Sequence, residues 1–286
     1  MTADLRFGVS LTTLEDRASW ADKCRRAEDL GYHVITVPDH LSMPAPLPAC
    51  VLAAEATTNI RVGTYVSNAS FYNPVLFVRD VVTSGQLTDG RLEIGLGAGW
   101  ARREFDQTGI PFESAAKRVD RLAETVAELG RAYHHRTDRP PLLIGGSGDR
   151  VLRMAARHAD IVSFSGTAFD PQGWGMAYLT AEEVNERVAL VDAELGRLGR
   201  DDVRRNIIVL RTQVTDNRPA ALEDYSRFLK GTMSPDQIDE LPAVLIGSPE
   251  EIAQQVLTRH KKFGFSYFTV QEAALDTFAT VLPLLT

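Results

Sequence analysis

Asp39 and His40 are adjacent side chains that can hold or move a proton, and they stand directly after a short apolar run. That run, Val34–Val37, is mostly β-branched and shows no helical period, which predicts a buried strand. Pro38 has no N–H to donate, so the strand should end there. Reactive residues just past the carboxyl end of a buried strand are typical of α/β enzymes. From this stretch alone, a capping role for Asp39 and a surface position for His40 remain an equal alternative.

Two glycine-rich segments could bind an anion through backbone amides. Residues 145–148 (Gly-Gly-Ser-Gly) lie between a predicted strand and a predicted helix. Open N–H groups and a helix N-terminus at such a place favour a phosphate without a cationic side chain. Residues 165–167 (Ser-Gly-Thr) add further amides and hydroxyls. Neither segment is a Walker A motif, because no Lys-Ser/Thr follows, and simple tight turns are the alternative reading of both.

A third glycine-rich segment, residues 95–99, imitates a dinucleotide-binding fingerprint without meeting it. Its third glycine falls one residue early, its strand is not the first, and no acidic residue ends a strand about 20 residues later. We interpret these glycines as allowing a flat ligand to approach bare backbone, with Trp100 as a wall of the site.

The rest of the chain alternates short apolar runs with helical segments. Strands are expected at residues 5–11, 34–37, 59–66, 91–94, 141–144, 160–164, 206–214 and 267–270. Helices are expected at residues 17–30, 49–56, 74–87, 114–133, 149–158, 181–195, 223–241 (with breaks), 249–264 and 274–285. This alternation over 286 residues predicts an α/β fold, a (β/α)₈ TIM barrel. No linker divides the chain, so we expect one domain of residues 1–286. An open, doubly wound sheet is the alternative, because periodicity cannot show closure.

In a closed barrel, the loops that follow the strands all open on one face. The residues expected to converge there are Ser10, Asp39, His40, 65–70, 97–100, 145–148, 165–167, 211–213 and Gln271.

Composition and charge exclude several other classes of protein. The chain is 44% hydrophobic and 24% charged, with a net charge of −7 and no basic cluster, so we expect no nucleic-acid partner. No apolar run approaches the roughly 20 residues that cross a bilayer, so we expect no membrane partner. Cys24 and Cys50 have no zinc-binding spacing, and no signal peptide opens the chain, which indicates a cytoplasmic protein. Isolated histidines predict no metal site, and the lack of a Gly-x-Ser-x-Gly elbow argues against a hydrolase triad.

Several short motifs occur in a characteristic order along nearly the whole chain. They are Pro38-Asp39-His40, residues 63–66 with Asn73-Pro74, residues 87–91, residues 95–100 with Glu104, Phe105 and Gly109, and residues 144–148, 155–160 and 247–251. In this order the chain resembles the bacterial luciferase-like flavin and deazaflavin oxidoreductases, particularly the branch that uses the deazaflavin coenzyme F420. The resemblance implies a luciferase-like (β/α)₈ barrel, usually a homodimer, with the coenzyme ring lying across the strand ends.

The resemblance also implies where the coenzyme binds. A non-proline cis peptide should join Tyr65 and Val66 behind the ring, and the phosphate should lie on residues 145–148 near residues 165–167. His40 matches the histidine that the family places beside the reactive edge. The coenzyme-binding candidates are Asp39, His40, Tyr65, Val66, Ser67, Gly97, Ala98, Gly99, Trp100, Gly145, Gly146, Ser147, Gly148, Ser165, Gly166 and Thr167.

The sequence departs from the family at two places. The F420-dependent sugar-phosphate dehydrogenases have a catalytic glutamate directly after the glycine turn, where this chain has Trp100, so a sugar phosphate is not the expected substrate. The segment between Tyr133 and Pro140 is shorter than in many relatives. We therefore expect a more open pocket, covered by a lid at residues 165–180 that carries Phe169, Trp174 and Tyr178.

The resulting expectation is hydride transfer between F420 and a small or medium, partly apolar organic substrate. His40 would be the general acid or base, since imidazole titrates near neutral pH, and Asp39 would orient it or bind the coenzyme. The sequence leaves open an FMN-dependent luciferase-like monooxygenase and a coenzyme-binding protein without turnover. A metal-dependent hydrolase that uses Asp39 and His40 is a more remote alternative.

Overall fold

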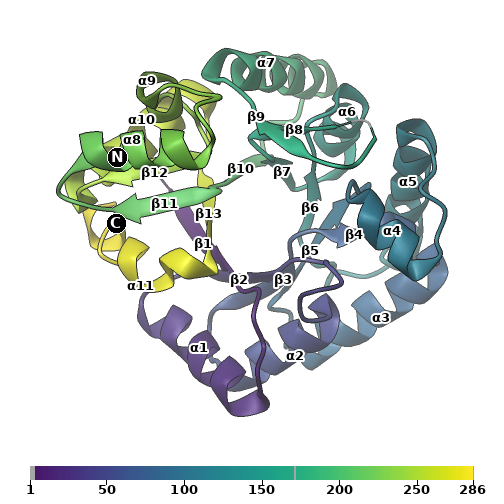
Figure 1. Ribbon diagram of the computed structural model, residues 1–286. Helices are drawn as coiled ribbons and strands as arrows, with labels where there is room; N and C mark the ends of the chain where they lie inside the picture. Colours follow the sequence, from purple (N-terminus) through teal and green to yellow (C-terminus); the bar gives the residue numbers. More distant parts are fainter. Residues whose placement is uncertain (1–3, 171, 286) are drawn as a thin grey trace.

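The barrel strands are short and mostly apolar, so each can be buried on both faces: one face packs against helices, and the other packs against side chains inside the barrel. The computed structural model describes residues 4–170 and 172–285 (Figure 1). Its barrel strands are β1 Arg6–Ser10, β2 Val34–Val37, β3 Arg61–Thr64, β5 Leu92–Gly97, β6 Leu142–Gly145, β7 Ile161–Phe164, β10 Arg204–Ile208 and β13 Tyr267–Gln271. All neighbouring pairs are parallel, and β3 pairs with β5 to close the ring. The (β/α)₈ barrel is therefore confirmed, and the open sheet is excluded.

Helices surround the barrel on its outside (Figure 1). They are α1 Arg17–Asp29, α2 Pro46–Ala56, α3 Pro74–Leu87, α5 Ala115–Ala132, α6 Asp149–His158, α7 Ala181–Leu198, α10 Pro249–Phe263 and the short α11 Leu275–Phe278. Several begin where the sequence signals a start. Asn73 caps α3, and Ser248 forms a capping box ahead of α10, each followed by a proline that needs no N–H partner in the first turn.

Three elements near the rim have different bounds from those expected. Helix α2 begins at Pro46, three residues earlier than predicted, because its prolines occupy the first turn rather than a loop. The third strand ends at Thr64, and after a break the chain resumes pairing with β5 as the two-residue strand β4, Ser67–Asn68. Strand β5 in turn runs through the glycine segment to Gly97.

The predicted seventh strand, residues 206–214, is in fact two strands. Its first part belongs to β10 in the barrel, between β7 and β13. Its second part, β11 Arg211–Val214, pairs outside the barrel with β12 Val244–Gly247, a strand that the sequence did not predict. An unbroken apolar run, residues 207–210, joins the two parts, so periodicity could not reveal the change of partner.

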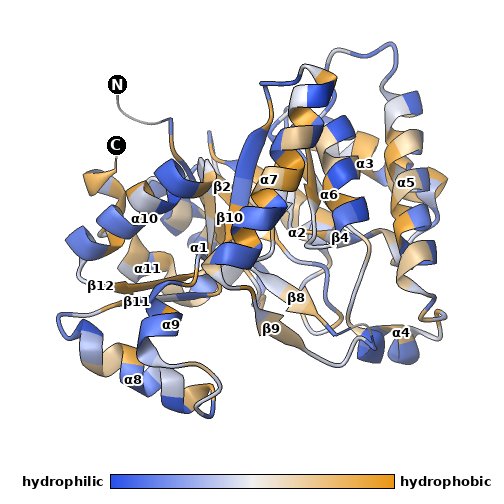
Figure 2. Ribbon diagram, turned by 90° about the horizontal axis from the view of Figure 1, so that it is seen from above, coloured by the Kyte–Doolittle hydropathy of each residue, from blue (hydrophilic) through white to orange (hydrophobic). Residues whose placement is uncertain are grey.

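Three further pieces lie at one end of the barrel (Figure 2). The predicted lid contains a hairpin of β8 Thr167–Phe169 and β9 Met176–Tyr178; one residue of it, Pro171, lies outside the described residues. Beside it are the short helix α4 Arg102–Thr108 and the helices α8 Arg218–Phe228 and α9 Pro235–Asp239. The predicted broken helix at residues 223–241 corresponds to α8 and α9, which pack on β12 around a small apolar cluster of their own.

The carboxyl-terminal segment does not form the single helix expected at residues 274–285. It is divided into the 3₁₀ turn Glu272–Ala274, helix α11, and the 3₁₀ turn Leu282–Leu284. Pro283 lies in the last turn and has no N–H for a longer helix, which accounts for the division.

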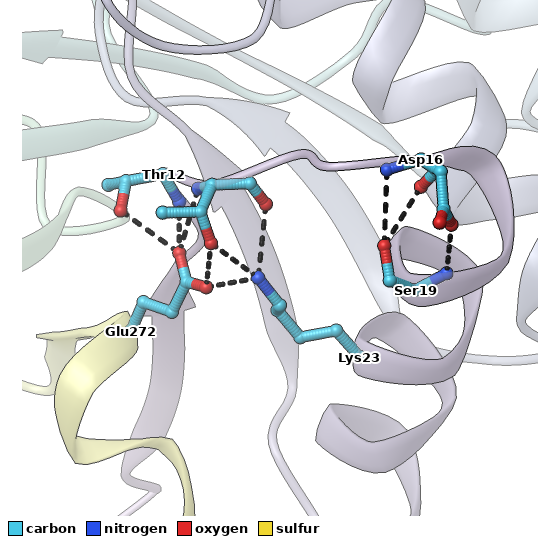
Figure 3. Close-up of polar contacts among 6 residues, drawn as sticks. Thr12, Asp16, Ser19, Lys23 and Glu272 are labelled. Atoms are coloured by element: carbon cyan, nitrogen blue, oxygen red, sulfur yellow. Dashed lines mark hydrogen bonds and ion pairs between the residues drawn. The ribbon is translucent and has the colours of Figure 1, made fainter.

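A partly buried carboxylate fixes the first loop at the rim (Figure 3). Glu272 follows β13 and accepts hydrogen bonds from the backbone N–H and hydroxyl of Thr12 and of Thr13, and it forms an ion pair with Lys23 of α1. The loop after β1 is therefore tied to the end of the neighbouring strand β13.

Candidate active site

Asp39 lies at the end of β2 and is bonded by the loop that follows β3. The backbone N–H of Asn68 donates to its Oδ2 at 2.9 Å, and the Tyr72 hydroxyl donates to its Oδ1 at 3.2 Å. Burial raises the pKa of Asp39, and these two hydrogen bonds oppose that effect. Both carboxylate oxygens thus have partners within the protein, which differs from the orienting role expected for Asp39 toward His40.

The carboxylate that contacts His40 is Glu104. The first turn of α4 carries Glu104, whose Oε1 lies 2.8 Å from His40 Nδ1 and also accepts the backbone N–H of Leu41 at 3.3 Å. Glu104 belongs to one of the sequence motifs but had no predicted role, and α4 was not predicted. A helix of seven residues is too short to show a clear period, so no signal pointed to it.

Two rings form an aromatic wall beside His40. Trp100 stacks on Phe169 of β8 with centroids 4.8 Å apart, and its ring meets the His40 imidazole edge-on at 6.3 Å. The lid hairpin therefore contributes directly to the wall. Trp174, also expected in the lid, is 64% exposed and lies under the guanidinium of Arg102 rather than against His40.

The bond between Tyr65 and Val66 is cis, as the resemblance implied. The Val66 side chain enters the barrel among three glycines. A Cβ added at Gly97 would lie 2.6 Å from Val66, and one added at Gly95 or Gly145 would lie 3.2 Å from it. Gly97 is therefore required by packing against Val66, and Gly95 by the Thr64 carbonyl oxygen, which would lie 2.2 Å from an added Cβ. This corrects the interpretation that Gly95 and Gly97 are bare to admit a flat ligand.

The next glycine has a similar explanation. Gly99 adopts φ +79°, and a Cβ there would lie 2.3 Å from the Asn68 side chain. The adjoining carbonyls also have partners, because Ser70 donates to Ala98 and Arg118 donates to Gly99, each at 3.0 Å. Contacts within the protein hold this turn in place, and Trp100, which follows it, belongs to the aromatic wall.

The Tyr65 side chain points into the barrel interior rather than to a ligand. Its hydroxyl lies 2.8 Å from Ser163 Oγ and donates to Asn206 Oδ1 at 2.6 Å, and Asn206 donates on to Thr269. Only the backbone of Tyr65 remains available at the rim. Its neighbour Ser67 is different: Ser67 Oγ is buried and has no hydrogen-bond partner among the described residues.

The 145–148 segment leads into α6 as expected. Gly148 is the N-cap residue of α6 and provides no side-chain cap, although Asp149 lies in the first turn. The Gly146 N–H is not free, because it donates to the Ser163 carbonyl at 3.2 Å. Arg187 of α7 donates to the Ser147 carbonyl at 3.2 Å, which places a cationic side chain at this loop that the sequence analysis missed.

The 165–167 segment is used largely by its own turn. The Ser165 hydroxyl donates to the Thr167 carbonyl at 2.8 Å, and the Thr167 N–H donates back to Ser165 Oγ at 3.3 Å. Gly166 has φ +64° and packs against Ala243. Fewer amides and hydroxyls of this segment are therefore free to bind an anion than the sequence predicted.

Residues 5–266 match the family model described as luciferase-like monooxygenase. The chain belongs to this family. Its resemblance to luciferase-like proteins, inferred from the motifs, is confirmed.

Two relatives and one structure show how this luciferase-like chain compares with known proteins. It is 27% identical to the F420-dependent glucose-6-phosphate dehydrogenase of Kribbella flavida, over 91% of this chain and 92% of that protein. It is 29% identical to the enzyme of the same name from Intrasporangium calvum, over 49% of this chain but only 51% of that protein. An F420-dependent secondary alcohol dehydrogenase, solved with an F420-acetone adduct, superposes with a TM-score of 0.78 over the whole of both chains at 17% identity. That likeness supports the fold.

No group of three or more His, Cys, Asp or Glu side chains within residues 4–170 and 172–285 could hold a metal ion. Among the same residues, no helix has the length and apolar character needed to span a membrane.

Proposed function

We propose that this protein is an oxidoreductase that transfers a hydride between coenzyme F420 and a small organic substrate. The observation that supports this most strongly is the match, over nearly the full length of both chains, to an F420-dependent dehydrogenase. The barrel rim carries the groups that such a reaction needs, with His40 beside an aromatic wall at the end of β2.

The residues at the rim fit a deazaflavin coenzyme with a phosphate tail. The buried Ser67 Oγ, which has no partner among the described residues, could donate to a ring or ribityl oxygen. The N-terminus of α6, which has no side-chain cap, and Arg187 beside Ser147 suit an anion. We propose that Val66 lies behind the ring and that residues 145–148 hold the phosphate, with residues 165–167 nearby.

Bound F420 accepts or donates a hydride at C5 of its ring, and the protein supplies orientation and a proton. His40 Nδ1 is bonded to Glu104, so Nε2 is the nitrogen that can exchange a proton with the substrate. Trp100 and the hairpin β8–β9, which carries Phe169, exclude water from one side of the His40 imidazole.

The aromatic wall indicates a partly apolar substrate. Trp100 takes the position of the acidic residue that the sugar-phosphate dehydrogenases use, and its partner is Phe169 rather than a cation. We therefore propose that glucose 6-phosphate is a poor substrate, although the full-length relative from Kribbella flavida is named for it.

Assembly and location are part of the same proposal. Val75 and Leu76 at the start of α3 are 59% and 52% exposed, and burying them would favour a homodimer. Cys24 and Cys50 are buried free thiols, which suits a reducing cytoplasm. Sedimentation equilibrium that gives the mass of one chain would refute the dimer.

Titration of the purified protein with F420 and, separately, with FMN tests the coenzyme. We expect saturable binding of one F420 per chain, and FMN binding at least tenfold weaker. Tight FMN binding without F420 binding would support the luciferase-like monooxygenase instead. F420 binding without turnover of any substrate in a broad panel would indicate a coenzyme-binding protein.

A further inference from the structure

Two groups restrain the His40 ring on two sides. Glu104 Oε1 lies 2.8 Å from Nδ1, and Trp100 meets the imidazole edge-on with a ring-centroid distance of 6.3 Å. The side chains of His40 and Glu104 are 31% and 15% exposed, so the contact is partly shielded from water.

The carboxylate is itself held in place. Glu104 Oε1 also accepts the backbone N–H of Leu41, the residue next to His40, so it is fixed relative to both the ring and the chain that carries the ring. Asp39 accepts from Asn68 and Tyr72, and among the described residues no hydrogen bond joins it to the His40 ring. Glu104 is therefore the carboxylate that determines the state of the ring.

A carboxylate can only accept, so the proton on the neutral His40 ring must lie on Nδ1. The lone pair is then on Nε2, the nitrogen without a hydrogen bond among the described residues. When Nε2 takes a proton from the substrate, the imidazolium that forms lies against the Glu104 carboxylate, which stabilises its positive charge.

We propose that Glu104 is a positioning residue for His40: it fixes the proton on Nδ1 and so directs Nε2 to the proton transfer. This inference rests on the proposed function, because it assigns Glu104 to the same reaction. It does not involve contact between Glu104 and coenzyme or substrate.

The tautomer can be measured without any coenzyme. In protein labelled with ¹⁵N-histidine, long-range ¹H–¹⁵N spectra of neutral His40 should show the proton on Nδ1. Glu104→Gln keeps an acceptor oxygen and should keep this tautomer, whereas Glu104→Ala should lose it. Asp106→Asn alters an exposed carboxylate on the same helix and serves as the matched control. A wild-type proton on Nε2, or an unchanged tautomer in Glu104→Ala, would overturn the proposal.

Kinetics give a second, separate readout. Glu104→Ala should lower kcat by roughly 10–100-fold, the loss that follows removal of a carboxylate orienting a metal-bound imidazole, while KM and coenzyme affinity stay within about threefold. Glu104→Gln should lower kcat by less than Glu104→Ala does, because it retains the hydrogen bond but not the charge. If Glu104→Ala melts early, the isosteric Glu104→Gln still decides: its kcat should fall below that of the wild type, and an unchanged kcat would show that the Glu104 charge does not contribute to the reaction. If wild-type protein binds no F420, the proposed function fails while the tautomer measurement still judges Glu104.

Discussion

Two carboxylates lie near His40, and the sequence pointed to the wrong one as its partner. Asp39 is adjacent in the chain, yet its oxygens bond Asn68 and Tyr72. Glu104 is 64 residues away and reaches the ring only because α4 folds over the rim. Adjacency in sequence predicts which residues share a strand end, but the direction of each side chain depends on neighbours that only the folded structure brings together.

At this scale His40 itself gives the sharpest prediction. His40→Ala should leave F420 affinity within about threefold and lower turnover by roughly 10²–10⁴-fold, because a general acid or base contributes that much. His135→Ala, an exposed histidine on the outside of the barrel, should change neither quantity. Steady-state kinetics with coenzyme titrations check this, and normal turnover in His40→Ala would exclude His40 as the proton carrier.

The elements at the rim differ in how well the sequence predicted them. Helix α6 was predicted with its observed bounds, because a glycine loop precedes it and its own residues show a strong apolar period. The hairpin β8–β9 was expected only as a lid loop, since two strands of three residues carry too little pattern. The close approach expected at the glycines of residues 95–99 is present, but the approaching groups belong to the protein: the Thr64 carbonyl, Val66 and Asn68.

The loop before α6 can be tested through Arg187. Arg187→Ala should weaken F420 binding by about tenfold, because it removes the one cation observed at the Ser147 carbonyl and so reduces the attraction for a phosphate. Arg197→Ala, on the same helix but paired with Glu194, is the control and should bind normally. Equal affinities of the two variants would place the phosphate elsewhere.

The hairpin can be tested through its link to α8. The hydroxyls of Tyr178 and Tyr225 lie 2.6 Å apart, joining β9 to α8. Tyr178→Phe should cost roughly 1 kcal/mol of local stability, so amide exchange across residues 167–170 and 172–178 should quicken several-fold while the barrel strands keep their rates. Unchanged exchange would show that this bond does not hold the lid.

For the whole molecule, counting eight strands was enough to predict the barrel, although the seventh strand was drawn too long and β12 was missed. The count survived because β11 and β12 pair with each other outside the barrel and add no barrel strand. Closure could not be predicted from periodicity, since it depends on the pairing of β3 with β5, whose residues are separated by a helix.

Glu272 tests how the rim contributes to the stability of the molecule. Burial raises the pKa of Glu272, but hydrogen bonds from Lys23, Thr13 and Thr12 outweigh it and hold the pKa at about 2, below its ordinary 4.5. A lowered folded pKa stabilises the fold above pH 4.5, and that stabilisation is lost as the pH falls toward 2. Glu272→Gln should therefore cost roughly 2–4 kcal/mol at pH 7.

Urea unfolding at several pH values checks this dependence on Glu272. The difference in the free energy of unfolding between wild type and Glu272→Gln should shrink at each step below pH 4.5. Glu15→Gln, an exposed control in the neighbouring loop, should unfold with the same free energy as the wild type at every pH. A difference that is constant with pH would mean that the charge of Glu272 does not contribute.

The most direct measurement for the whole account follows a labelled hydrogen under anaerobic conditions. The protein is mixed with F420 and a panel of partly apolar organic substrates deuterated at the carbon to be oxidised, and the reduced coenzyme is analysed by mass spectrometry. The account predicts that one deuterium per turnover appears on the coenzyme for at least one such substrate and that glucose 6-phosphate transfers far less. Oxygen consumption with reduced FMN, together with no deuterium on F420 from any substrate, would contradict it.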